Sequence, residues 1–82
     1  MKKAWIKCRH AVVNFSRAME EVLRQNDYKG KVGCYEFLLG QLLEEVIEFA
    51  RAKTPEEKQK ECCDIANFAM MIFDNNENNR DG

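Results

Sequence analysis

The chain has 82 residues, of which 45% are hydrophobic and 33% are charged, so it is long enough for one globular domain and too short for two. Its formal net charge of -1 argues against non-specific binding to nucleic acid. With only four glycines and one proline, the composition favours an all-α fold over a turn-rich β fold. We therefore expect a single helical domain over residues 1–82.

The first predicted helix runs from about Lys3 to Gln25. Apolar residues recur there in steps of three and four and form a stripe that we expect to face the core: Trp5, Cys8, Val12, Phe15, Met19 and Val22. Because Lys7 and Arg9 interrupt the apolar residues near the start, we expect neither a targeting segment nor a membrane span. We therefore expect the protein to be cytoplasmic. Residues 26–33 contain two glycines and turn-forming residues and predict a loop.

The second predicted helix runs from about Tyr35 to Lys53, and the third runs from Pro55 to Phe73 or Asp74. Residues 75–82 are polar and predict a disordered tail. A short turn joins the two helices, so we expect them to form an antiparallel hairpin. Apolar residues cover about half the circumference of the second helix, more than one neighbouring helix usually buries. We therefore expect the chain to assemble with itself, as a dimer or tetramer, into a four-helix-bundle type of oligomer.

The turn between these helices carries a strong helix-start signal. Thr54 is a typical N-cap residue, Pro55 suits the first helical position, and Glu57 is placed to close a capping box. The end of the second helix and the start of the third are therefore the best-defined boundaries in the sequence.

Each of these two helices carries a pair of acids one turn apart, Glu45 with Glu48 and Glu61 with Asp64. In a hairpin centred on the connecting turn, Glu48 is level with Glu61, and Glu45 is level with Asp64. Carboxylates that face each other across a helix pair can share metal ions. In the alternative, the hairpin is rotated so that apolar residues fill the seam and the acids face water.

A seam of four acids is physically reasonable only around bound cations, because burying unpaired like charges costs several kcal/mol per ion. Oxygen ligands select hard ions, which predicts Mg²⁺ or Mn²⁺. A di-iron site would require Glu-x-x-His motifs, and the only histidine, His10, lies outside the two acidic helices. The chain also lacks the C-x-x-C spacing of a zinc site, so we expect free thiols at all four cysteines: Cys8, Cys34, Cys62 and Cys63.

The sequence Glu44-Glu45-Val46-Ile47-Glu48, followed by Glu61-Cys62-Cys63-Asp64, resembles the MazG-like all-α nucleoside triphosphate pyrophosphohydrolases. The resemblance covers about residues 38–72. It implies hydrolysis of a nucleoside triphosphate to the monophosphate and pyrophosphate, with the metal on the four acids that match the motif: Glu45, Glu48, Glu61 and Asp64. It also implies that Glu44 is the catalytic general base.

The candidate substrate-binding residues are inferred less directly from the sequence. Asn67 lies one turn after Asp64, where its amide could bind the sugar or a phosphate of the substrate. The tail holds only one basic residue, so phosphate-binding cations are expected from the first helix, with Lys7 and Arg17 as candidates, or from a second subunit. His10 is a candidate to stack on the base.

Two alternatives to this activity remain open. The related phosphoribosyl-ATP pyrophosphohydrolases share the acids, but they typically follow the last one with a Tyr-His pair, whereas Ile65-Ala66 follows Asp64 here. The chain could instead be a non-catalytic helical interaction module whose metal-free acidic groove binds a basic partner. Metal binding distinguishes this module from the enzyme.

Overall fold

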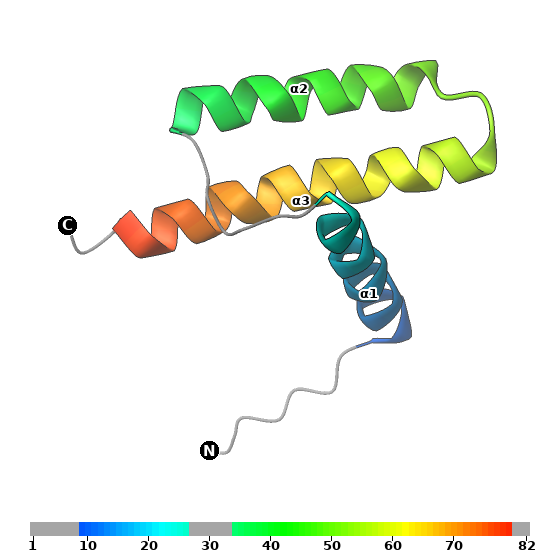
Figure 1. Ribbon diagram of the computed structural model, residues 1–82, viewed down its shortest axis with the longest axis horizontal. Helices are drawn as coiled ribbons and strands as arrows, with labels where there is room; N and C mark the ends of the chain where they lie inside the picture. Colours follow the sequence, from blue (N-terminus) through cyan, green and yellow to red (C-terminus); the bar gives the residue numbers. More distant parts are fainter. Residues whose placement is uncertain (1–8, 27–33, 80–82) are drawn as a thin grey trace.

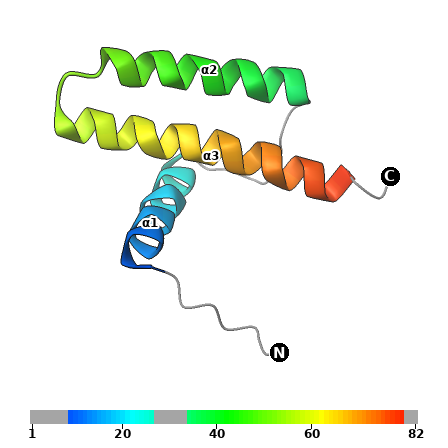
Figure 2. The ribbon, with the colours of Figure 1, turned by 180° about the vertical axis from the view of Figure 1, so that it is seen from behind.

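The computed structural model describes residues 9–26 and 34–79, and every regular element within these ranges is helical. Three helices follow one another: α1 (His10–Gln25), α2 (Tyr35–Arg51) and α3 (Pro55–Asn79). The predicted all-α class is thus confirmed for the described residues. Figure 1 shows α2 and α3 side by side, with the C-terminal end of α1 against the middle of α3, and Figure 2 shows the same arrangement from behind.

The turn between α2 and α3 contains the predicted capping box. The backbone N–H of Glu57 donates to Oγ1 of Thr54 at 3.1 Å, and Oε1 of Glu57 accepts from the N–H groups of Thr54 at 3.3 Å and Lys53 at 2.8 Å. Three backbone donors at and just before the start of α3 find side-chain acceptors in this way. The capping box fixes where α3 begins and therefore how the two acidic helices align.

Three helix ends differ from the sequence prediction. Arg9 is extended and α1 begins at His10, so the predicted start at Lys3 is wrong. Ala52 is also extended, which ends α2 at Arg51 and leaves Lys53 free to contribute its N–H to the capping box. The third helix does not end at Phe73 or Asp74 but continues to Asn79. Asparagine lowers helix propensity by only tenths of a kcal/mol per residue, and extending a formed helix needs no new nucleus.

Helix α1 packs on α3 and, within the described residues, makes no contact with α2. The two helices are tied by a hydrogen bond from Nδ2 of Asn67 to the backbone oxygen of Met19 at 3.2 Å. Two members of the predicted core stripe are exposed, Val12 by 53% and Phe15 by 41%. The stripe is therefore only partly covered, because α3 meets α1 near its C-terminal end (Figures 1 and 2). Trp5 and Cys8 of the stripe lie outside the described residues.

The buried core of the described residues is small. It consists of Leu38 on α2, exposed by 1%, together with Cys63 and Asn67 on α3. Cys34, Cys62 and Cys63 are free thiols, as predicted. Large apolar side chains remain exposed on α2 in particular: Tyr35, Phe37, Leu39, Leu43, Val46 and Ile47.

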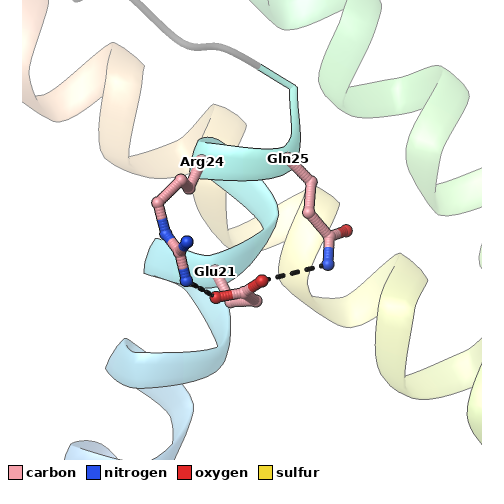
Figure 3. A network of polar contacts seen from close by, with 3 residues as sticks. All are labelled: Glu21, Arg24 and Gln25. Atoms are coloured by element: carbon pink, nitrogen blue, oxygen red, sulfur yellow. Dashed lines mark hydrogen bonds and ion pairs between the residues drawn. The ribbon is translucent and has the colours of Figure 1, made fainter.

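The last turn of α1 carries a small polar network. Figure 3 shows the Glu21 carboxylate between Arg24, with which it forms an ion pair, and Gln25, whose Nε2 donates to it at 3.2 Å. All three side chains are exposed, so the contribution of this network to stability is small. Arg24 also interacts favourably with the negative end of the α1 dipole.

Replacing Thr54 by Ala is expected to lower the free energy of unfolding by about 1 kcal/mol, because the Glu57 N–H loses its capping partner. Urea unfolding followed by circular dichroism measures the change. Ser16→Ala is the matched control, since the Ser16 hydroxyl donates to Val13 within α1 and caps no helix. Equal stability changes in the two variants would show that the capping box contributes nothing.

Candidate metal centre

Three carboxylates converge where α2 and α3 face each other. Oxygen atoms of Glu45, Glu61 and Asp64 all lie within 4.8 Å of one another, and the three side chains are partly buried. We call this group the carboxylate cluster. Three oxygen donors at such a spacing can hold a metal ion.

The local fold explains the convergence. Glu61 and Asp64 are three residues apart on α3 and therefore lie one above the other on the same face. Glu45 comes from α2, and its carboxylate lies within 4.8 Å of both α3 acids. Leu38, two turns before Glu45, is fully buried in the same seam and holds the two helices together beside the cluster. The alternative rotation, with these three acids facing water, is thus not the one that the structure shows.

The cluster favours protonation of one of its members. Burial raises the pKa of Glu45 from 4.5 to about 7, and a hydrogen bond with Glu61 acts in the same direction. The negative charges of Asp64 and Glu61 raise this pKa further. In addition, Oε1 of Glu61 is buried and has no hydrogen-bond partner among the described residues. Uncompensated negative charge and an unpaired carboxylate oxygen are both properties that a bound cation would correct.

One side chain already brings positive charge to the cluster. Nζ of Lys60 donates to Oδ2 of Asp64 at 2.7 Å, and this hydrogen bond raises the pKa of Lys60. The side chain of Asp64 is 12% exposed, whereas that of Lys60 is 61% exposed. Lys60 is not among the site residues predicted from the sequence, although its spacing of four residues from Asp64 is a recognised signal for a helical ion pair.

Glu48, the fourth predicted ligand, is not among the converging atoms. It is exposed and lines a cavity of about 290 Å³ together with Arg51, Ala52, Glu57 and Glu61. The cavity adjoins the carboxylate cluster because Glu61 belongs to both. At about 100° per residue, Glu48 is turned about 60° from Glu45 around the axis of α2, toward the side that carries Arg51. Its role as a ligand stays a prediction.

Two further predicted residues flank the cluster in different environments. Glu44 is exposed and lies on the same side of α2 as Glu48 and Arg51. Asn67 is buried, and its Nδ2 is engaged by the Met19 backbone, whereas its Oδ1 has no partner among the described residues. Asn67 therefore joins α1 to α3. Its role in substrate binding stays a prediction.

The predicted contributions of the first helix are not brought to the cluster. His10 and Arg17 are exposed and lie on the side of α1 opposite Met19, whose backbone contacts α3. Lys7 lies outside the described residues. Arg51, which sequence reasoning overlooked because it follows the acidic motif, is the basic residue that lines the cavity.

The chain matches no protein-family model, and no curated protein or solved structure is detectably similar to it. In the part of the chain that the structure describes, none of the helices has the length and apolar character needed to cross a membrane. Functional inference therefore rests on the carboxylate cluster and its surroundings.

The stability of the metal-free protein is expected to fall as the pH rises from about 5 to about 7.5. The folded state binds the Glu45 proton up to about pH 7, and the unfolded chain releases it near pH 4.5, so the stabilisation from this proton is lost between these values. Thermal melts across this range measure the effect, which we expect to amount to several degrees.

Glu45→Gln should remove most of this pH dependence, because the glutamine side chain does not titrate. Glu36→Gln, at an exposed position on the same helix, is the control and should keep it. If the melting temperatures of wild type and Glu45→Gln changed equally with pH, the raised pKa of Glu45 would not be the cause of the pH dependence.

Proposed function

We propose that the protein is a metal-dependent nucleoside triphosphate pyrophosphohydrolase that releases nucleoside monophosphate and pyrophosphate. The observation that supports this most is the convergence of Glu45, Glu61 and Asp64, three of the acids in the motif that resembles the MazG-like enzymes. An exposed Glu44 beside them adds a candidate base. Free thiols at the described cysteines agree with the cytoplasmic location that we propose.

The residues of the cluster fit Mg²⁺ or Mn²⁺. All donors are carboxylate oxygens, which hard divalent ions prefer, and Oε1 of Glu61 is a buried acceptor without a partner in the described chain. Glu45, Glu61 and Asp64 would hold the ion, and Glu48, which lines the adjoining cavity together with Glu61, would assist them. When bound, the ion would supply charge neutralisation to the phosphate oxygens of the substrate.

The cavity beside the cluster is the proposed place of the triphosphate. Arg51 lines it and would bind the phosphates that leave as pyrophosphate, as a guanidinium group is well suited to do. A water molecule would attack the α-phosphorus as the bond to the bridging oxygen of the leaving pyrophosphate breaks. The Glu44 carboxylate would accept the proton from this water, which is the role of a general base.

We also propose that two copies of the chain associate through one side of α2. Leu39, Leu43 and Val46 lie between about 100° and 160° from Glu45 around the helix axis, on the side away from Glu44 and Arg51. All three are exposed, and the positions on this side between Leu39 and Ala50 carry no charge. Exposed apolar stripes of this kind are typical of helix–helix interfaces.

A second copy is the partner that the packing favours. Leu38 and Cys63 are the only hydrophobic residues of the described chain that are buried. So small a core gives limited stability, and pairing two α2–α3 units would complete a four-helix bundle. The metal centres would then lie on the outer sides of the assembly, accessible to substrate.

A non-catalytic interaction module is the second candidate. The exposed stripe on α2 is the observation that favours it, because such a surface binds a partner helix whether or not the chain is an enzyme. This candidate predicts no nucleotide turnover with any divalent metal.

The reaction is tested by incubating nucleoside triphosphates with the protein and Mg²⁺ and identifying the products. We expect monophosphate and pyrophosphate. Glu44→Gln should lower the turnover rate by about 10² to 10⁴, because the water loses its base, but should leave nucleotide affinity nearly unchanged. Glu45→Gln should weaken metal binding as well. Glu36→Gln, which removes an exposed acid near the start of α2, is the control and should retain full activity.

Release of phosphate and diphosphate by the wild type would overturn the proposed reaction. Wild-type turnover by Glu44→Gln would remove Glu44 from the mechanism and leave the rest of the proposal standing.

The proposed association is tested by light scattering. The wild type is expected to have at least twice the 9.6 kDa mass of the chain at micromolar concentration. Leu43→Lys should shift it toward the monomer, because a charge cannot be buried unpaired in the interface. Val12→Lys alters an apolar side chain of similar exposure on α1 and should leave the mass unchanged. A folded wild-type monomer would contradict the proposal.

A further inference from the structure

Lys60 occupies a position that the proposed mechanism does not use. Its ammonium group lies 2.7 Å from Oδ2 of Asp64, at the edge of the carboxylate cluster. It forms an ion pair with this member of the cluster. Asp64 is thus engaged by a cation that belongs to the protein itself.

The charges of the cluster show what this cation does. Three carboxylates within 4.8 Å repel one another when they are all ionised, and partial burial limits screening by water. Lys60 supplies one compensating positive charge. A divalent ion would supply two at the same place, so it would make the ammonium group redundant and would be repelled by it.

The two partners differ in their freedom to move. Asp64 is largely buried at a fixed position on α3, whereas Lys60 is 61% exposed and has a long flexible side chain. Its ammonium group can therefore leave Asp64 for solvent without any rearrangement of the helices. The oxygen that it releases would be free to ligate a metal ion.

We propose that Lys60 is an internal counter-cation that competes with the metal ion for Asp64 and thereby sets the metal concentration at which the site fills. The inference rests on the proposed metal centre and adds to it a residue that controls occupancy. Lys60 acts through Asp64, so its function is regulatory and not catalytic.

The test compares Mn²⁺ binding to variants by isothermal titration calorimetry at fixed pH and low salt. Lys60→Gln removes the competing charge and is expected to bind Mn²⁺ roughly three- to tenfold more tightly than the wild type. Lys60→Arg keeps the charge and should bind like the wild type. Lys58→Gln is the matched control, because it removes the same charge from the same helix. Its Nζ lies 4.9 Å from the centre of the Phe49 ring and not on the cluster.

Thermal melts provide a second measurement that does not depend on activity. Without metal, Lys60→Gln should melt below Lys58→Gln, because the carboxylates have lost their counter-cation. Saturating Mn²⁺ should abolish this difference, since the metal replaces the lost charge.

The outcomes separate this inference from the metal centre on which it rests. Wild-type affinity or weaker binding in Lys60→Gln, with Mn²⁺ bound by the wild type, would overturn the role of Lys60 and leave the metal centre intact. Failure of both wild type and Lys60→Gln to bind Mn²⁺ would overturn both. Mn²⁺ binding by Lys60→Gln but not by the wild type would support the proposal, because Lys60 would then keep the metal ion out of the site completely.

Discussion

The repulsion between carboxylates in the seam of α2 and α3 is the constraint on which the rest of the structure depends. Oxygen atoms of Glu45, Glu61 and Asp64 lie within 4.8 Å of one another in a partly buried place, where apolar residues would pack at lower electrostatic cost. The metal-free chain balances this charge in two ways, with the proton that Glu45 retains up to about pH 7 and with the ammonium group of Lys60. A divalent cation would replace both, so the same arrangement that destabilises the metal-free fold favours metal binding.

The position of each acid along its helix follows from the sequence. The side of the helix on which it faces its neighbours could not be predicted fully. The capping box at Thr54 fixes the turn, and Glu45 of α2 comes within 4.8 Å of Glu61 and Asp64 of α3. Rotation about the helix axis depends on how the whole seam packs. On α2, Leu38 is buried and Phe49 is partly buried, whereas Glu48 is exposed. The end of α3 at Asn79 could not be located from the sequence, because helix propensity differs little among the residues there.

Helix α1 shows a second limit of sequence patterns. Its apolar stripe correctly predicts an amphipathic helix, yet Val12 and Phe15 remain exposed because periodicity does not identify which surface covers the stripe. The contact with α3 includes a polar group that the stripe does not predict, the buried Asn67 amide that donates to the Met19 backbone. The same reasoning applies to α2, where Leu39, Leu43 and Val46 are exposed. Helix α2 carries more apolar surface than one chain covers, which is why we propose that a second copy associates with this helix.

The central claim is that the carboxylate cluster is a divalent-cation site, and the position of bound Mn²⁺ tests it most directly. In a two-dimensional NMR titration, paramagnetic Mn²⁺ broadens the amide signals of nearby residues at substoichiometric concentration. The claim predicts that signals around Glu45 and from Glu61 to Asp64 disappear first, whereas those around Glu21, whose carboxylate is engaged by Arg24 and Gln25, persist. Broadening that begins at Glu21, or that affects all acidic residues equally, would contradict it.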